Sequence, residues 1–171
     1  MAAMLLAFVS LHGHAQPNLE HAVKATFLYK FAAFIEWPPE TFASATSPLV
    51  LCLLGSDPVS RLADEAAIGQ TIDAHPVVVR HLADVSRGAD CHVLYVASLQ
   101  EETAAGRIER LRGMPILTVT DGAREGRAGV VNFVIADNRV RFEVDLEAAA
   151  LQRLTVSSKL LSLAVRVRPR S

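Results

Sequence analysis

Cysteine and aromatic residues are scarce in this chain, and neither sign of charge is in excess. These features narrow the classes of function that the protein could have. Only 2 of the 171 residues are cysteine and 6% are aromatic. The formal net charge is −1, so the chain lacks the basic excess that is typical of nucleic-acid-binding proteins. After the first sixteen residues, no apolar run avoids charge, glycine and proline for long enough to span a bilayer. We therefore expect a soluble mature protein, unless a partner holds it at a membrane.

The N-terminal residues resemble a secretory signal peptide. Residues 4–11 form a short apolar run, and Gly13-His14-Ala15 is a small-x-small pattern of the kind that signal peptidase cleaves. The basic n-region that usually precedes such a run is missing. We expect residues 1–15 to be a signal peptide and residues 16–171 to form a single domain. The alternative is an apolar N-terminal helix of a cytosolic protein.

The expected export would bring the two cysteines, Cys52 and Cys91, into an oxidising compartment. An oxidising compartment favours a disulfide between them. Each lies on an expected strand of one sheet. The alternative is a pair of buried free thiols, because cysteine is among the residue types that are most often buried.

Apolar segments alternate with helical patterns along most of the chain. Residues 19–34 carry an apolar stripe at helical spacing, and Trp37-Pro38-Pro39 ends that helix. Residues 49–54 are continuously apolar, as in a strand buried on both faces. Further strands are expected at residues 76–80, 91–96 and 116–120, and further helices at residues 59–67 and 100–111. This alternation predicts an α/β fold, with a mostly parallel sheet and helices on both of its faces.

The pattern changes near the C-terminal part of the chain. Residues 130–136 and 139–145 are separated by Asp137-Asn138, which is a two-residue turn signal. We expect an antiparallel hairpin at the edge of the sheet, followed by helical segments at 146–152 and 157–165. Arg166, Arg168 and Arg170 then form a basic tail. This tail is either a solvated terminus or a weak contact for an anionic membrane surface.

No catalytic or cofactor-binding motif is present. The chain has neither a G-x-S-x-G elbow nor a P-loop, and the glycines of residues 122–129 precede a strand, whereas a phosphate-binding loop normally opens a helix. No two histidines of the mature chain are spaced three or four apart on a helix. We therefore expect no catalytic residues, no metal and no cofactor.

Two groups of residues are candidates for partner or dimer contacts. The first helix is apolar over more than one face, with Phe34 and Trp37 at its end, whereas a surface helix needs only one buried stripe. Arg139 and Arg141 alternate with apolar residues along the hairpin and are expected to be exposed. Aromatic and arginine side chains are common anchors of interfaces. The alternative is that the aromatic residues are core and that the arginines are merely solvated.

Two longer motifs make the chain similar to a known family. VKATFLYKFAAFIEWP (residues 23–38) and VVNFVIADNRVRFEVDLEAAALQRLTVSSKLLSLA (residues 130–164) resemble the opening and closing motifs of the YfiR-like family. The resemblance implies a periplasmic, homodimeric regulator that binds the periplasmic domain of an inner-membrane diguanylate cyclase. It implies that this binding represses the cyclase, lowers cyclic di-GMP and restrains biofilm formation. It also implies that Cys52 and Cys91 are a redox-sensitive pair.

The chain departs from the family pattern at two places. Arg153 stands where the family usually has a glycine, so the chain there either accepts strain or ends its helix differently. A glycine pair is reduced to Ala128-Gly129. Two other functions stay open, a small-molecule-binding sensor and an enzyme. The enzyme ranks last because the chain lacks a nucleophile–base motif.

Overall fold

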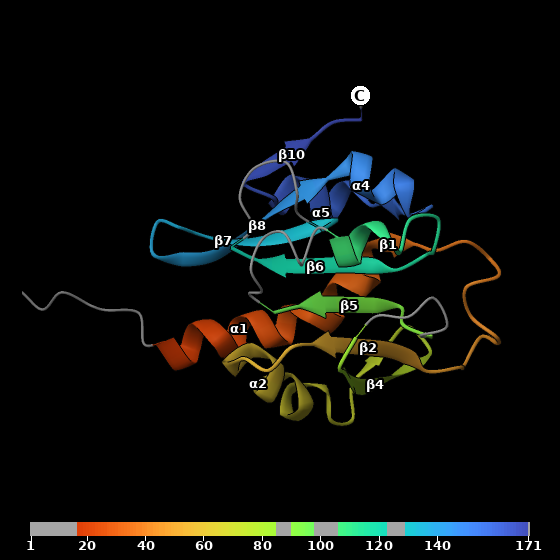
Figure 1. Ribbon diagram of the computed structural model, residues 1–171, viewed down its shortest axis with the longest axis horizontal. Helices are drawn as coiled ribbons and strands as arrows, with labels where there is room; N and C mark the ends of the chain where they lie inside the picture. The colour runs from red at the N-terminus through yellow and green to blue at the C-terminus, as the bar shows by residue number, and fades with distance from the viewer. Residues whose placement is uncertain (1–16, 85–89, 98–105, 123–128, 171) are drawn as a thin grey trace, which may run out of the picture.

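The protein folds around one eight-stranded sheet. The structure is a computed structural model, and it describes residues 17–84, 90–97, 106–122 and 129–170. The strand order is β10-β8-β7-β6-β5-β2-β4-β3 (Figure 1). Within the described ranges, no helix combines the length and the hydropathy needed to cross a bilayer. The expected signal peptide lies outside the described residues.

The centre of the sheet is parallel, as the sequence predicts. It contains β4 (His75–Leu82), β2 (Leu49–Leu54), β5 (Val93–Val96), β6 (Leu117–Asp121) and β7 (Val131–Ala136). Numbered along the chain, these five strands lie in the order 2-1-3-4-5. In open sheets of this order, the connections that follow β2 and β5 run in opposite directions. A crevice therefore forms between the carboxyl ends of these two strands.

The hairpin is present, but its position in the sheet differs from the expectation. β7 pairs antiparallel with β8 (Arg139–Asp145), and the turn residues Asp137 and Asn138 have φ angles of 50° and 55°. Positive φ at both positions is the geometry of a type I′ turn. The expectation of an edge hairpin is wrong, because β10 (Arg166–Arg168) pairs in parallel with β8 and becomes the edge.

The basic tail is therefore part of the sheet. Arg168 lies 3.2 Å from Asp145 and 3.4 Å from Glu147, and Arg166 lies 3.5 Å from Glu143. Both arginines are exposed, as expected of a solvated terminus, but they lie on a strand and form surface ion pairs with carboxylates of β8 and of the helix after it. β10 escaped prediction because three residues carry too little periodicity to identify a strand.

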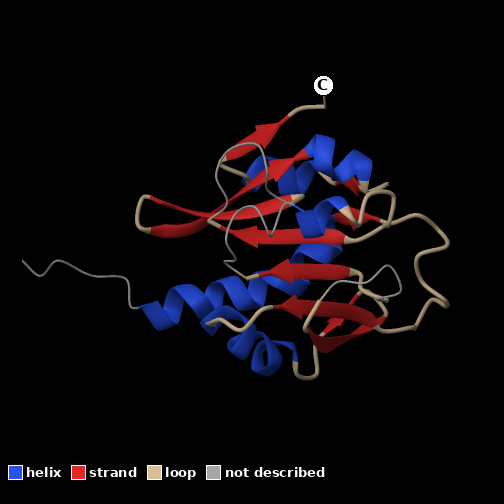
Figure 2. Ribbon diagram, viewed as in Figure 1, coloured by secondary structure: helices blue, strands red, loops and turns tan. Residues whose placement is uncertain are grey.

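Two helices lie together on one face of the sheet (Figure 2). α1 (Pro17–Lys30) continues into the 3-10 helix η1 (Phe31–Phe34). α2 (Pro58–Ala67) begins at Asp57, whose carboxylate accepts a hydrogen bond of 2.7 Å from the backbone N–H of Ser60. Alternate residues of β2 point to opposite faces, so Leu51 and Leu53 join the core under α1, whereas Val50, Cys52 and Leu54 join a second core on the other face.

The remaining helices and strands are short. α4 (Leu146–Leu151) and α5 (Ser158–Leu163) follow the hairpin, as expected. β1 (Ile35–Glu36) and β9 (Thr155–Val156) form a separate antiparallel pair, and β3 (Thr71–Ile72) pairs with β4. Of the helix expected at 100–111, only residues 106–111 are described, and residues 106–109 are helical.

Candidate partner-binding site

A disulfide lies in the core on the face away from α1. Cys52 is on β2 and Cys91 comes just before β5, and their sulfur atoms are 2.00 Å apart with a Cα–Cα distance of 5.7 Å. Both residues are buried. The bond joins the two strands that flank the crevice, and the surrounding core is apolar. The side chains of that core are Val50, Leu54, Leu94, Val96, Leu111 and Ile116.

Four aromatic and histidine rings cluster at the amino ends of β2 and β5. Phe42 stacks between His75 and His92, with ring centroids 4.0 and 4.4 Å away, and the Trp37 ring meets Phe42 edge-on at 5.9 Å. The backbone N–H of Val50 donates a hydrogen bond of 3.0 Å to Nδ1 of His92. Burial lowers the pKa of His92, because it disfavours the charged imidazolium. The cluster therefore fixes the loop that follows β1 (Ile35–Glu36) against the sheet and disfavours the charged form of His92.

Phe34 and Trp37 are partly accounted for by this packing. Both are half-buried and lie against the main core. Each still offers a part-exposed aromatic surface, so their predicted role in partner binding stays a prediction.

A buried ion cluster joins α1 to the carboxyl end of β6. Nζ of Lys24 lies 2.8 Å from both carboxylate oxygens of Asp121 and 2.7 Å from Glu20. Lys24 is only 4% exposed. Burial alone lowers the pKa of Lys24, but the hydrogen bonds and charges of Asp121 and Glu20 outweigh it and raise that pKa. The cluster therefore stays charged, and its single cation is shared by two carboxylates.

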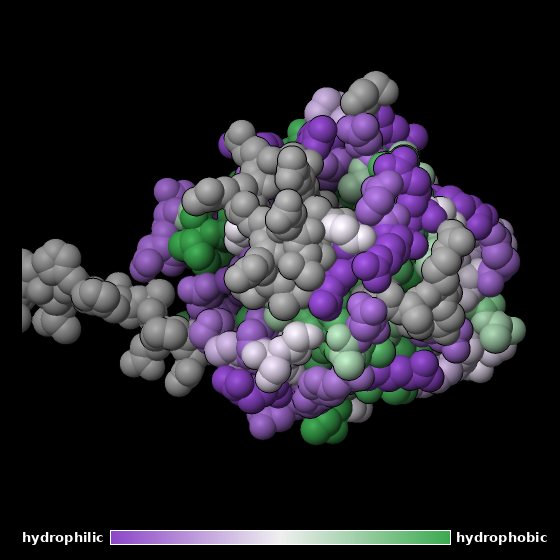
Figure 3. Space-filling model, in the orientation of Figure 1, coloured by the Kyte–Doolittle hydropathy of each residue, from purple (hydrophilic) through white to green (hydrophobic). Residues whose placement is uncertain are grey.

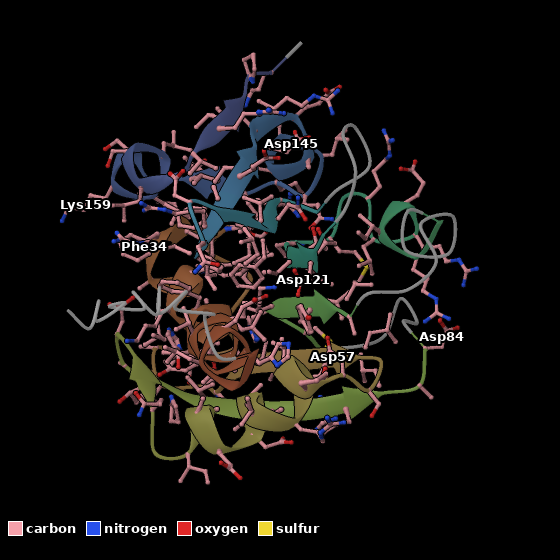
Figure 4. The ribbon with its side chains drawn as sticks, turned by 90° about the vertical axis from the view of Figure 1, so that its left-hand side faces the viewer. Phe34, Asp57, Asp84, Asp121, Asp145 and Lys159 are labelled. Atoms are coloured by element: carbon pink, nitrogen blue, oxygen red, sulfur yellow. A yellow bond between two sulfur atoms is a disulfide. The ribbon has the colours of Figure 1, made fainter. Side chains whose placement is uncertain are left out.

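A second polar contact fills the crevice between β2 and β5. The Tyr95 hydroxyl donates a hydrogen bond of 2.7 Å to Asp57, the residue that also caps α2. Burial, followed by the charge and hydrogen bond of Asp57, raises the pKa of Tyr95. Asp57 and Asp121 both lie at this edge of the sheet (Figure 4). Because these groups satisfy one another, they present few unpaired polar atoms to a ligand or substrate.

An apolar groove opens between α1 and the end of the hairpin. Its volume is about 290 Å³, and its apolar walls are Leu19, Val23 and Phe27 from α1 and Ile135 and Val140 from the hairpin. Arg139 lies at its rim. Hydrophobic side chains are visible where the hairpin lies, at the left-hand end of the molecule (Figure 3). The sequence predicted Arg139 as a partner contact but not Leu19 or Ile135, because no local pattern shows that two apolar residues far apart in the chain both stay exposed.

The four predicted partner contacts therefore fall into two groups. Arg139 and Arg141 lie on β8, and Arg141 is half-buried opposite Val134. Phe34 lies fifteen residues along α1 and η1 from Leu19, which amounts to roughly 20 Å at the rise of a helix. The structure thus places Arg139 by the groove near the start of α1, and Phe34 beyond the end of that helix.

Among the described residues, no three histidine, cysteine, aspartate or glutamate side chains converge to hold a metal ion. The distinctive features of the described residues are a disulfide-braced sheet, a buried ion cluster and an apolar groove. They define a small α/β domain whose distinctive surfaces are suited to binding.

Comparison with known protein families identifies the family to which this α/β domain belongs. A family model described as YfiR/HmsC-like matches residues 21–165, which is most of the chain. The chain therefore belongs to the YfiR/HmsC-like family. No curated protein matches it.

Proposed function

We propose that this protein is a periplasmic regulator that binds a membrane-bound signalling protein, a diguanylate cyclase, and represses it. Cyclic di-GMP and biofilm formation would rise when that binding is released. The observation that carries the proposal is the family match over residues 21–165. The buried Cys52–Cys91 disulfide supports it, because such bonds persist in oxidising compartments.

The proposal includes export and dimerisation. Residues 1–15 would be removed as a signal peptide, leaving a mature chain that begins at Gln16. Mass spectrometry of the protein from periplasmic extracts of its host tests this step. A full-length chain found in the cytosol would contradict it. Sedimentation of the mature protein would test the homodimer.

The regulatory role is tested by deleting the gene and measuring cyclic di-GMP. We expect its level to rise in the deletion strain and to return when the wild-type gene is restored. Complementation with Arg141→Ala tests that residue: lost repression at unchanged thermal stability would support an interface role. If deletion leaves cyclic di-GMP unchanged under all conditions, the repressor proposal fails.

A small-molecule sensor is the second candidate. The groove beside α1 favours it, since ligand sites are mostly apolar with few polar groups. Its volume of about 290 Å³ is at the lower end of the range for ligand pockets. A thermal-shift screen of the mature protein against apolar carboxylates tests this candidate.

A further inference from the structure

The groove beside α1 exists because this helix diverges from the hairpin toward its own N-terminus. Near the end of the helix, Phe31 is 2% exposed and its ring lies 5.6 Å from that of Phe133 and 5.1 Å from that of Phe142. Toward the start, Phe27 and Val23 are half-buried and Leu19 is 64% exposed. The helix and the hairpin thus form a wedge that is closed at Phe31 and open at Leu19.

The hairpin shows the same gradient of exposure. Phe133 on β7 is fully buried, whereas Ile135, two residues further along the same face, is 50% exposed. Its partner across the ladder, Val140, is half-buried. Two apolar surfaces therefore face each other across the open end of the wedge without meeting.

The charges at the rim of the wedge are uneven. On the helix side, the carboxylate of Glu20 lies 2.7 Å from Nζ of Lys24, but it shares that single cation with Asp121, so this side keeps an excess of negative charge. On the hairpin side, the side chain of Arg139 is exposed, and no ion pair or hydrogen bond joins it to a residue in the described part of the chain. Asn138 beside it is neutral. The hairpin side of the rim thus offers an exposed cation next to an apolar floor, which complements an apolar group accompanied by a carboxylate.

The apolar surface also extends beyond the groove. Leu19 and Ile135 stand on its two flanks, and both expose half or more of their surface. A ligand small enough to fill the groove would leave these flanks in water. A protein segment laid across the wedge would bury the flanks together with the floor.

We infer that this wedge, formed by Leu19, Val23, Phe27, Ile135 and Val140 with Arg139 at its rim, is where the regulated membrane protein docks. The docking element is a segment that presents a large apolar side chain to the wedge and an adjacent carboxylate to Arg139. This inference rests on the proposed function, because it assigns the surface and the chemistry of that partner.

The test measures binding of the mature chain to the purified periplasmic domain of its cognate diguanylate cyclase, by calorimetry. Two variants alter the wedge, Ile135→Ser and Arg139→Glu. Two matched controls, Val78→Ser and Arg80→Glu, alter exposed residues of the same kinds on β4. β4 lies four strands from β7, or roughly 19 Å at the usual strand spacing. Thermal unfolding shows whether each variant is folded.

We expect each wedge variant to weaken binding by about tenfold or more, because buried apolar and arginine anchors dominate interfaces. The controls should bind like the wild type. If folded wedge variants bind as tightly as the wild type, the wedge is not the docking site and the proposed function survives. If the wild-type chain does not bind the cyclase domain, the proposed function itself fails. If decanoate binds in an Arg139-dependent way and the cyclase domain binds all variants equally, the wedge is a small-ligand site and the inference is overturned.

Discussion

His92 is a buried histidine whose ring nitrogen accepts a hydrogen bond from the backbone. Nδ1 accepts a hydrogen bond from the backbone N–H of Val50. Protonation of Nδ1 would therefore place two N–H donors face to face without an acceptor. A backbone hydrogen bond and the charge of Asp90 favour the protonated ring, whereas His75 and Arg80 disfavour it. Burial is the largest cause of its lowered pKa. The folded state therefore disfavours the charged ring, whereas the unfolded chain does not.

This difference predicts a pH dependence of stability. Because the unfolded state binds the proton more readily, the free energy of unfolding should fall as pH drops below the ordinary histidine value of 6.5. His92→Asn keeps an acceptor for the Val50 N–H but does not titrate. Urea unfolding at a series of pH values should give a flatter profile for this variant than for the wild type. Parallel profiles would show that His92 does not cause the dependence.

Arg153 adopts a backbone conformation that usually belongs to glycine. Its φ is 58°, and it follows α4 in a Schellman arrangement, with Leu154 N–H donating to the Ala149 carbonyl and Arg153 N–H to that of Ala150. Of the two outcomes considered from the sequence, strain and a different helix end, the structure shows the strained one. An exposed ion pair with Glu40 accompanies it and contributes little.

Arg153→Gly should therefore stabilise the protein. Relief of the left-handed strain outweighs the extra freedom of glycine in the unfolded chain, for a net gain of about 0.5 kcal/mol. Arg153→Ala is the control, since it loses the same ion pair but keeps the strain. Chemical unfolding of the three proteins should rank glycine above arginine and arginine above alanine. A glycine variant no more stable than the alanine variant would contradict this account.

At the scale of elements, the Lys24 cluster holds α1 against β6. Lys24→Met would leave Asp121 and Glu20 without their cation in a mostly buried site. We expect a loss of about 3 kcal/mol in the free energy of unfolding, since breaking a buried pair leaves an uncompensated charge. The double variant Lys24→Met/Asp121→Asn should recover part of it. If the single variant is as stable as the wild type, the cluster does not anchor the helix.

The elements that the sequence predicted are those with long, clean patterns. β2 was predicted at its observed bounds because six apolar residues stand between turn signals, and the hairpin was predicted from its alternation and its Asp137-Asn138 turn. The strands β1, β3, β9 and β10 have two or three residues each, too few to show a pattern, and all but β3 pair with remote partners. The contact between Lys24 and Asp121 spans 97 positions, and the wedge depends on the angle between α1 and the hairpin. No local pattern encodes either of them.

For the whole molecule, the disulfide connects positions that are 39 residues apart. In the chain-entropy model, closing a loop of that size stabilises the fold by about 4 kcal/mol. Cys52→Ala/Cys91→Ala should lose roughly that amount, and a reductant should lower the melting temperature of the wild type but not that of the variant. If the wild type melts at the same temperature with and without reductant, the bond is not structural.

The pairing of β1 with β9 has a consequence for when the protein can fold. Although α1 can pack on α2 early in synthesis, β1 completes its pairing only when Val156 has been made, because Ile35 meets Val156. Contacts between such distant positions form slowly, because a long loop must close first. The part of the molecule that β1 and β9 join would therefore stay open in a nascent chain until its final residues are made.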